Sequence, residues 1–310
     1  MNTLLLTSLD TNMKYEQTQF GFTVTECDYS SADAEQVKKL VGDGRFVVIK
    51  NKEALTARTL VEFYRSIGNV VKQDVDTVDG CVDGYGELVK AGKGRLFSGK
   101  EDGELEWHCA GMNRAVSDDI VAMYMAIHTS SGGDTFFSDS QTAFTDLDPI
   151  TQEQCRQIKG KYVTYSLKQS IENMHYKEVF HDKEMLLAFK DIDGNPSFDS
   201  QVNRKDLVTV HPITGVAGLY FPWSVIRGFT GMPVTEQKLL YHKLKAHTLQ
   251  DKYIYRHHWD QYDIVLSDQH HSLHRRESYD GNRELWRAGI VLQSKASSIE
   301  EWSCMSSRTE

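Results

Sequence analysis

Cysteine is scarce in this chain, and its distribution excludes two kinds of architecture. The five cysteines among 310 residues are scattered and form no Cys-x-x-Cys pair. An odd number at irregular spacing argues against a disulfide framework, and the lack of close pairs argues against a structural zinc site. The pattern predicts a protein of a reducing compartment, and we expect it in the cytoplasm.

Long apolar runs and an excess of positive charge are also missing. No segment approaches the roughly 20 apolar residues of a membrane span. The run Leu4–Leu6 is too short for a signal peptide, and Asp10 soon follows it. A net charge of −9 disfavours a broad nucleic-acid-binding surface, although a local basic pocket is compatible with it. We therefore expect a soluble protein that spans no membrane and binds no nucleic acid.

The hydrophobic pattern predicts a mainly antiparallel β core with helices packed on it. A helix is expected to begin at Ser31 and to stop at Gly42–Gly44, and residues 234–247 have clear helical spacing. Short apolar runs such as 46–49 recur at regular spacing, which is typical of a sandwich or barrel. Because no repeat, low-complexity segment or linker divides it, we expect residues 1–310 to form a single domain.

Residues 72–105 differ from the rest of the chain. They are rich in Gly, Asp and Lys, and their periodicity is weak. A long irregular stretch inside a compact chain is often a lid or a loop at a functional site. The alternative is a solvated excursion on the surface, and the sequence favours neither.

Two of the twelve histidines, His108 and His274, stand at the ends of predicted strands beside loops. Two neutral imidazoles and one carboxylate on one face can hold Fe(II) and leave three positions open for small molecules. Arg283 and Arg287 fall on one face of a later predicted strand, where an arginine can hold a carboxylate through paired hydrogen bonds. The alternative for both arginines is a solvated strand face.

Four motifs, met in this order along the chain, resemble those of one enzyme family. They are Gly103–His108, Gly132–Asp139, His211–Gly215 with Leu219–Phe221, and Asp263–Gln269 followed by His274 and Arg283. Together they resemble the taurine dioxygenase-like (TauD/TfdA-like) branch of the Fe(II)- and 2-oxoglutarate-dependent oxygenases. Each motif alone is weakly specific, but the ordered set is specific and extends over roughly residues 45–292.

This resemblance implies a mainly β fold with flanking helices (α+β), built on a double-stranded β-helix, the jelly-roll of cupin-like proteins. The cofactors that it implies are Fe(II), 2-oxoglutarate and O2. By the same resemblance, His108 and His274 would bind iron, and Thr135 and Arg283 would hold 2-oxoglutarate. Arg287 would contact the co-substrate or an anionic group of a small-molecule substrate.

The resemblance also suggests which residues face the substrate. Phe221, Trp223 and residues of the 72–105 stretch are expected to line its pocket. The neighbouring Arg275 and Arg276 favour an anionic substrate, unless they are simply solvated. The oligomeric state stays open, a homo-oligomer included.

The chain departs from the family pattern at the acidic iron ligand. Two residues after His108 the family has Asp or Glu, whereas this chain has Ala110, and neither Cys109 nor Gly111 replaces the acid. Related halogenases have Ala or Gly there, and chloride binds iron in the vacated position. We therefore count Ala110 with His108 and His274 as the catalytic site, and we favour chlorination of an aliphatic C–H bond, with chloride as a further cofactor.

Three other interpretations are open. In the first, the enzyme is a hydroxylase with two protein ligands, and water fills the third place on the iron. In the second, the chain binds a small molecule without turnover, although the retention of His108, Thr135, His274 and Arg283 argues against a decayed site. In the third, Ala110 is an engineered substitution.

Two neighbouring features bear on this site. Strand alternation points Cys109 away from the metal side, so we expect it to pack in the core. Of the three histidines His270, His271 and His274, the family register counted from Asp268 favours His274 as the iron ligand.

Overall fold

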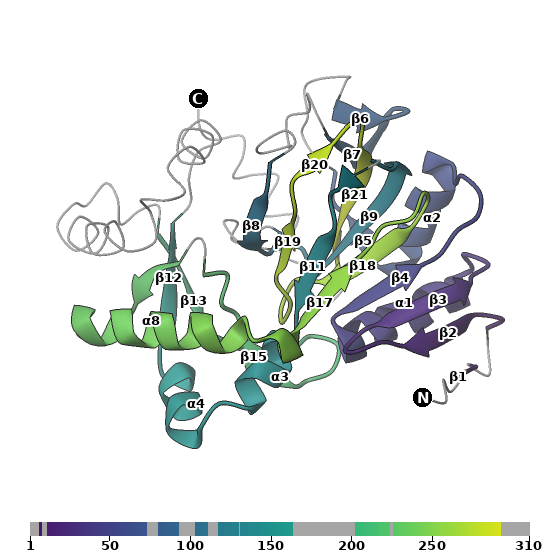
Figure 1. Ribbon diagram of the computed structural model, residues 1–310. Helices are drawn as coiled ribbons and strands as arrows, with labels where there is room; N and C mark the ends of the chain where they lie inside the picture. Colours follow the sequence, from purple (N-terminus) through teal and green to yellow (C-terminus); the bar gives the residue numbers. More distant parts are fainter. Residues whose placement is uncertain are drawn as a thin grey trace, which may run out of the picture.

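The protein is described here from a computed structural model. The structure describes residues 6–7, 11–72, 80–92, 103–110, 117–129, 131–163, 202–223 and 226–292. Within these residues the chain is mainly β, with strands at its centre and helices at its periphery (Figure 1). None of the helices in these ranges is long and apolar enough to cross a membrane.

The larger sheet has ten strands. They are β1 (Leu6–Thr7), β2 (Lys14–Gln17), β3 (Phe22–Glu26), β4 (Phe46–Ile49), β5 (Asn69–Val70), β6 (Cys81–Val82), β7 (Tyr85–Gly92), β9 (Ile120–Ile127), β18 (Ile264–Asp268) and β21 (Glu284–Val291). Their order is β1-β2-β3-β4-β18-β9-β21-β7-β6, and β5 pairs with β21 outside that path. The strands β3 and β4 pair in parallel, whereas the strands that frame the site, β4, β18, β9, β21 and β7, pair antiparallel.

A smaller, antiparallel sheet of four strands faces the larger one. In spatial order it consists of β17 (Ile254–His257), β11 (Thr135–Ser138), β19 (His274–Arg276) and β8 (Leu105–His108). Phe46 and Val48 of β4 belong to the same buried cluster as Phe137 of β11. The two sheets are therefore joined by a shared apolar layer.

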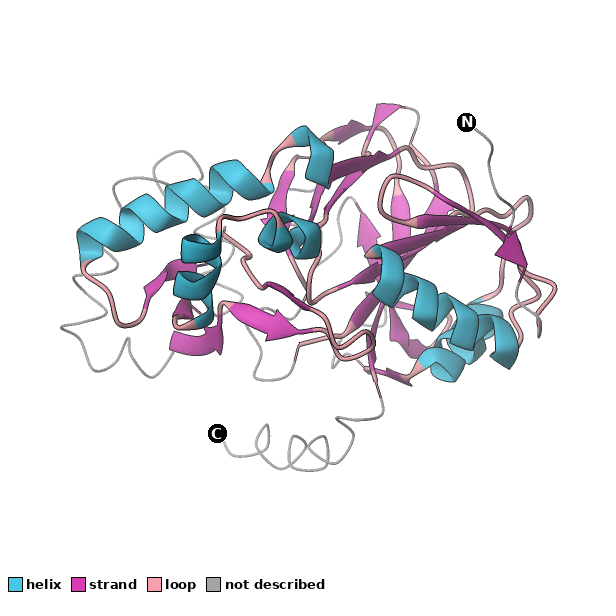
Figure 2. Ribbon diagram, turned by 90° about the horizontal axis from the view of Figure 1, so that it is seen from below, coloured by secondary structure: helices cyan, strands magenta, loops and turns pink. Residues whose placement is uncertain are grey.

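Two helices cover the other face of the larger sheet, α1 (Ser31–Gly44) and α2 (Ala57–Ile67) (Figure 2). Val47 and Ile49 of β4 pack with these helices in a second buried cluster, whereas Phe46 and Val48 point toward the smaller sheet. A strand that is covered on both faces can be apolar at every position. This explains the uninterrupted apolar run at 46–49.

A third group of elements lies beyond the end of the smaller sheet (Figure 1). It contains α3 (Ser140–Thr145), α4 (Pro149–Arg156), α8 (Val234–Thr248), and a three-stranded sheet of β13 (Val202–Asp206), β12 (Lys159–Val163) and β16 (Ile226–Phe229). The remaining short elements are β10 (Ser131–Gly132), β14 (Val208–Val210), β15 (Ala217–Leu219), η2 (Asp251–Tyr253) and β20 (Tyr279–Asp280). Trp107 of β8 belongs to the buried cluster of this group and so connects it to the smaller sheet.

The first helix agrees with the prediction at both ends. It begins at Ser31, with Ser30 as its side-chain cap, and its last residue, Gly44, lies within the predicted stop at Gly42–Gly44, with Arg45 as the C-cap. Gly44 lies so close to Phe22 that a Cβ there would fall within 2.6 Å of the ring. The glycine at the end of α1 therefore also allows the helix to pack closely on β3.

The expectation of an irregular stretch at 72–105 is wrong for its middle. Residues 80–92 form the β6–β7 hairpin at the edge of the larger sheet, where β7 pairs with β21. Pairing with a strand from the far end of the chain stabilises this segment, and local periodicity carries no signal of such pairing. Residues 73–79 and 93–102 lie outside the described residues, so the prediction of a lid there is not tested.

The layer between the two sheets generates a prediction on stability. Phe46 is fully buried and stacks on Phe137 and Tyr255, with ring centroids 5.0 and 4.7 Å away. We expect Phe46→Ala to lower the free energy of unfolding by about 3–5 kcal/mol, because it removes buried contacts and leaves a cavity. Urea denaturation measures this quantity. The control Ile150→Ala, at an 83% exposed position, should change it by less than about 0.5 kcal/mol. A similar effect of both substitutions would contradict the assigned layer.

Candidate active site

Two histidines face each other across one strand pair of the smaller sheet. His108 is the last residue of β8, and His274 is the first residue of β19. The two residues are direct partners in the antiparallel register. Their ring centroids lie 4.2 Å apart, with planes tilted by 52°. The fold therefore brings together two imidazoles that are far apart in the sequence, as the sequence analysis predicted.

An irregularity in this strand pair orients the first ring. The register changes between His274 and Arg276, so that Arg276 pairs with Leu105. In the displaced segment the carbonyl oxygen of Glu106 lies 2.6 Å from Nδ1 of His108. A carbonyl oxygen only accepts hydrogen bonds, so Nδ1 carries the proton and Nε2 keeps its lone pair. A neutral ring in this tautomer can bind a metal through Nε2.

The second ring is buried and neutral. Burial, followed by the electrostatic influence of the neighbouring His108 and Arg287, holds the pKa of His274 well below its usual value. Its Nδ1 is buried and has no hydrogen-bond partner among the described residues. A buried polar atom without a hydrogen-bond partner lowers the free energy of unfolding by on the order of 1–3 kcal/mol. The ring is therefore incompletely satisfied by the described chain, which fits a ligand to an ion or a contact to a bound molecule.

The position of the missing acid is occupied by a small, buried side chain. Ala110 belongs to the apolar cluster between the sheets. Its N–H donates to Oε1 of Gln269 over 2.6 Å, and Nε2 of Gln269 donates back to the carbonyl oxygen of Ser267 over 3.0 Å. Within the described ranges, no group of three or more His, Cys, Asp or Glu side chains is placed to hold a metal ion. No described residue therefore replaces the acidic ligand.

The prediction for Cys109 is confirmed. Its sulfur lies 3.4 Å from the hydroxyl oxygen of Tyr220, among the buried side chains of the α8 group. Burial raises the pKa of the thiol to about 11, so the thiolate is not formed at neutral pH. Cys109 is a packing residue and lies on the other side of the strand from the imidazole of His108.

A buried arginine lies at the other end of this site. Arg283 is only 2% exposed and is the largest fully buried side chain in the described chain. Its Nη2 donates a long hydrogen bond of 3.5 Å to the carbonyl oxygen of Gly133, and its Nε has no partner among the described residues. Burial, together with the charge of Arg276, lowers the pKa of Arg283 to about 9, so it remains charged at neutral pH. A buried charge without an ion-pair partner is unfavourable, and a bound anion would stabilise it.

Thr135 and the Gly132-Gly133 turn complete this end of the site. Thr135 is buried and is the register partner of Arg276 on β19. Gly133 has φ of +81°, and a Cβ there would come within 3.2 Å of Nε of Arg283. The glycine thus allows both the left-handed turn and the close approach of the guanidinium. Arg283 and Thr135 present donors that suit a carboxylate.

Arg287 lies on β21, as strand alternation from Arg283 predicts, but its guanidinium already forms an ion pair. Its Nη2 forms an ion pair of 3.0 Å with Oδ2 of Asp118, whose side chain is 2% exposed. Gly289 makes room for this carboxylate, since a Cβ there would lie 2.6 Å from Cγ of Asp118. An anion at Arg287 must therefore share the guanidinium with Asp118. Contact of Arg287 with a co-substrate or substrate stays a prediction.

The two neighbouring arginines fall on opposite faces of β19. Arg275 lies on the outer face, where it stacks on Phe136 at 3.9 Å and pairs with Glu104 at 2.7 Å. Arg276 points inward, on the same face as His274, and donates to the carbonyl oxygen of Gly103 over 2.5 Å. The idea that Arg275 favours an anionic substrate is therefore wrong, because its charge is used on the outside of the sheet.

Of the two aromatic residues expected to line the substrate pocket, Phe221 lies in the core and Trp223 lines a groove. Phe221 is 1% exposed and packs against Phe229 and Tyr241, so it belongs to the core and not to a pocket wall. Trp223 lines a groove of about 530 Å³ together with Phe136. Strand alternation places Phe136 on the outer face of the smaller sheet, opposite Thr135. The groove therefore lies along the outer face of the smaller sheet, and Glu106 and Trp107, the residues before His108, also line it.

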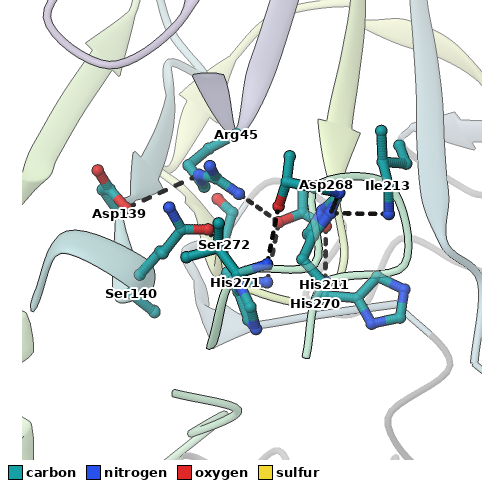
Figure 3. A network of polar contacts seen from close by, with 12 residues as sticks. Arg45, Asp139, Ser140, His211, Ile213, Asp268, His270, His271 and Ser272 are labelled. Atoms are coloured by element: carbon teal, nitrogen blue, oxygen red, sulfur yellow. Dashed lines mark hydrogen bonds and ion pairs between the residues drawn. The ribbon is translucent and has the colours of Figure 1, made fainter. Parts of the chain in front are cut away.

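A buried polar network holds the turn that leads into β19 (Figure 3). The carboxylate of Asp268 accepts hydrogen bonds from the backbone N–H groups of His270 and His271, at 2.8 and 2.9 Å. It also lies 3.2 Å from Nε2 of His211 and 3.5 Å from Nη1 of Arg45. This network fixes the path of the chain just before the imidazole of His274.

The network also separates the three clustered histidines by role. Nε2 of His270 lies 2.7 Å from Oδ1 of Asp119, and Nε2 of His271 lies 3.1 Å from the carbonyl oxygen of Thr209. His274 alone among the three is the register partner of His108. The geometry thus agrees with the choice of His274 from the family register.

Comparison with known proteins assigns this mainly β protein to a family. The family model "Taurine catabolism dioxygenase TauD, TfdA family" matches residues 9–288. The chain therefore belongs to the TauD/TfdA family.

Two curated relatives have a related chemistry in their names. The chain is 29% identical over 160 residues to the alpha-ketoglutarate-dependent 2,4-dichlorophenoxyacetate dioxygenase of Burkholderia sp. (strain RASC), covering 51% of this chain and 48% of that protein. It is 25% identical over 191 residues to the (S)-phenoxypropionate/alpha-ketoglutarate-dioxygenase of Sphingobium herbicidovorans, covering 61% and 63%. The chain thus spans about half the length of the first curated relatives that it matches.

Solved structures share the fold over most of the chain. A taurine dioxygenase from Burkholderia xenovorans aligns with a TM-score of 0.70 and 18% identity, covering 91% of this chain and 90% of that one. AAD-2 in complex with Mn(II) and N-oxalylglycine aligns with a TM-score of 0.65 and 20% identity, covering 90% and 97%. At these identities the likeness shows the fold alone. It confirms the predicted class, mainly β with flanking helices.

The Asp268 network generates a prediction on pH. Burial alone would raise the pKa of Asp268, but the hydrogen bond from His211 and the charges of His270 and Arg45 hold it well below its usual value. The stabilisation is therefore complete above the unfolded-state pKa of about 3.9 and is lost as the pH falls below it. We expect Asp268→Asn to cost about 3–5 kcal/mol at pH 7, as for a broken buried ion pair.

Urea denaturation of both proteins at pH 7, 5, 4 and 3 measures this dependence. The difference between the wild type and Asp268→Asn should be constant at pH 7 and 5 and should shrink at pH 4 and 3. The exposed Asp43→Asn serves as a control and should follow the wild type at each pH. A difference that stays constant down to pH 3 would contradict the assigned role of the Asp268 carboxylate.

Proposed function

We propose that this protein is an Fe(II)- and 2-oxoglutarate-dependent enzyme that hydroxylates an aliphatic carbon of a small anionic molecule. The proposal rests on the buried guanidinium of Arg283, whose Nε has no hydrogen-bond partner among the described residues, together with the facing imidazoles of His108 and His274. A metal alone would leave the arginine charge unsatisfied, and a carboxylate alone would leave the buried imidazole unsatisfied. A metal together with a dicarboxylic co-substrate accounts for both.

In this proposal His108 and His274 hold the iron, and Arg283 and Thr135 hold the distal carboxylate of 2-oxoglutarate. When bound, iron, 2-oxoglutarate and O2 supply the oxidising chemistry. The chain supplies two neutral imidazoles, because Glu106 fixes the tautomer of His108 and burial keeps His274 unprotonated. The buried surroundings of these groups limit the access of water to the site.

The substrate is proposed to be a small molecule with a carboxylate or a similar anion. The names of the curated relatives, dioxygenases of 2,4-dichlorophenoxyacetate and of (S)-phenoxypropionate, support this class. Arg287 is the candidate partner of the anion, and Asp118 must then share its guanidinium. The double-stranded β-helix, the single-domain organisation and the cytoplasmic location belong to the same proposal.

Chlorination is the second candidate, and the nature of residue 110 favours it. Ala110 stands where the family has an acid, and no described side chain takes the place of that acid. A methyl group leaves room for chloride beside the iron, which a carboxylate would exclude. No relative reported above is named as a halogenase, so we place hydroxylation first.

A substitution of Arg283 tests the co-substrate site. Arg283→Met is expected to weaken 2-oxoglutarate binding by roughly 30-fold, since a hydrogen bond from a charged donor contributes about 2 kcal/mol. The measurement is an anaerobic titration of the Fe(II)-loaded protein with 2-oxoglutarate, followed by the visible charge-transfer band. The control is Arg275→Met, the adjacent strand residue that points outward, which should bind as the wild type does. If wild-type protein shows no such band, both enzymatic candidates are wrong.

A substitution of Ala110 distinguishes hydroxylation from chlorination. For a hydroxylase, succinate formation and hydroxylated product should not depend on chloride, and Ala110→Asp should bind Fe(II) more tightly and keep hydroxylating. For a halogenase, chlorinated product should require chloride, and Ala110→Asp should abolish it. Mass spectrometry of products from a panel of aryloxy acids, amino acids and other small acids makes the measurement.

Because Ala110 is buried, the acid at this position can also impair folding. Ala110→Gly is therefore the matched control, since it keeps the open position and should retain the reaction of the wild type. Binding of 2-oxoglutarate without any succinate formation across the panel would instead favour the catalytically silent binder.

A further inference from the structure

Trp259 makes a hydrogen bond that orients the hydroxyl group of Thr135. Trp259 follows strand β17, and its side chain is 4% exposed. Its indole Nε1 donates to Oγ1 of Thr135 over 2.9 Å. The indole N–H is only a donor, so the Thr135 oxygen must accept. This contact joins two residues that the sequence analysis did not connect.

The direction of this hydrogen bond decides what the Thr135 hydroxyl can still do. With one lone pair used by Trp259, the hydroxyl proton must be donated to another atom. In the described part of the chain, the contact with Trp259 is the hydrogen bond that the Thr135 side chain makes, and no acceptor for its proton is present there. A buried donor without an acceptor is unfavourable. The acceptor that suits this site is the same anion that Arg283 requires.

Trp259 is held firmly enough to serve as a fixed donor. Its ring packs edge-on against His257, with centroids 4.7 Å apart, and it belongs to the apolar cluster between the sheets. His257 is itself the register partner of Thr135 on the neighbouring strand. Nε2 of His257 lies 3.5 Å from the carboxylate of Asp263, which also pairs with Lys50 at 2.7 Å. The acceptor thus lies on β11, and the donor lies two residues after the adjacent strand β17.

We propose that Trp259 is a positioning residue for the co-substrate. Trp259 takes no part in the chemistry itself. It holds the Thr135 hydroxyl so that the hydroxyl proton points toward the carboxylate bound by Arg283. The inference rests on the proposed function, because it assumes a carboxylate at that end of the site. It goes beyond that function by assigning a role to a residue outside the ligand-contacting set. A group held in advance in the binding orientation loses less entropy when the ligand binds.

A double-mutant cycle tests the proposal. Trp259→Phe removes the N–H and keeps an aromatic ring, and Thr135→Val removes the hydroxyl and keeps the shape. Calorimetry on the Mn(II)-loaded protein measures the Kd of N-oxalylglycine, a non-reacting analogue of 2-oxoglutarate. We expect Trp259→Phe to raise this Kd about 5-fold, since a neutral hydrogen bond contributes about 1 kcal/mol. The double variant should bind no more weakly than Thr135→Val alone, because Trp259 acts through the hydroxyl.

Two controls distinguish positioning from packing. Thr135→Ser keeps the hydroxyl and should keep the sensitivity to Trp259→Phe. Trp286→Phe removes another indole hydrogen bond, the one to Glu284 at 2.8 Å, on the helix-covered side of the sheet, and should leave the Kd unchanged. Steady-state kinetics supply a second readout. The KM for 2-oxoglutarate should rise in Trp259→Phe with little change in kcat, which a general loss of packing would not produce.

The outcomes are separable. An unchanged Kd in Trp259→Phe, or effects of the two substitutions that simply add, would overturn the positioning role. If the wild type itself fails to bind N-oxalylglycine, the proposed function fails instead. Should Trp259→Phe not fold, indole ¹⁵N–¹H resonances of the wild type and of Thr135→Val give the answer. One resonance should shift on binding in the wild type but not in Thr135→Val, and the absence of this difference would again overturn the proposal.

Discussion

The pairing of β19 with a neighbour on each side is the constraint on which the site depends. On one side β8 brings His108 opposite His274, and on the other side β11 brings Thr135 opposite Arg276. Backbone hydrogen bonds of a sheet set these distances, so the side chains need no flexible loop to meet. The Asp268 network fixes the chain just before β19 and thereby fixes the register of both pairs. Function and fold therefore share one set of contacts.

The interior around these strands is apolar, so each polar group buried in it has a large effect on the stability of the folded protein. Phe46, Val48 and Phe137 exclude water from the layer between the sheets. In such surroundings Nε of Arg283 and Nδ1 of His274, which have no hydrogen-bond partner among the described residues, are unfavourable to bury. Binding energy of a ligand can offset that cost. This is the physical basis of the proposal that a metal and an anionic co-substrate bind here together.

Residue 110 is where the family resemblance and the local chemistry point in different directions. The family match and the names of the relatives support a dioxygenase. The methyl group of Ala110, held beside the site through its backbone contact with Gln269, leaves open the position that an acid would fill. Either water or chloride can occupy such a position. In the proposal, the difference between the two reactions is therefore confined to one small space next to His108 and His274.

Much of this protein follows from its sequence alone. The apolar run at 46–49 and the helical spacing at 234–247 predicted β4 and α8, because burial on both faces and helical periodicity are local signals. The ordered motifs selected His108, His274, Thr135 and Arg283, and the structure brings these residues into one site. Only the tertiary structure revealed the strand in the 72–105 stretch, the partner that Asp118 provides for Arg287, the outward direction of Arg275, and the contact of Trp259 with Thr135. Each of these joins residues distant in sequence or depends on strand register, and no local pattern records which strands will become neighbours.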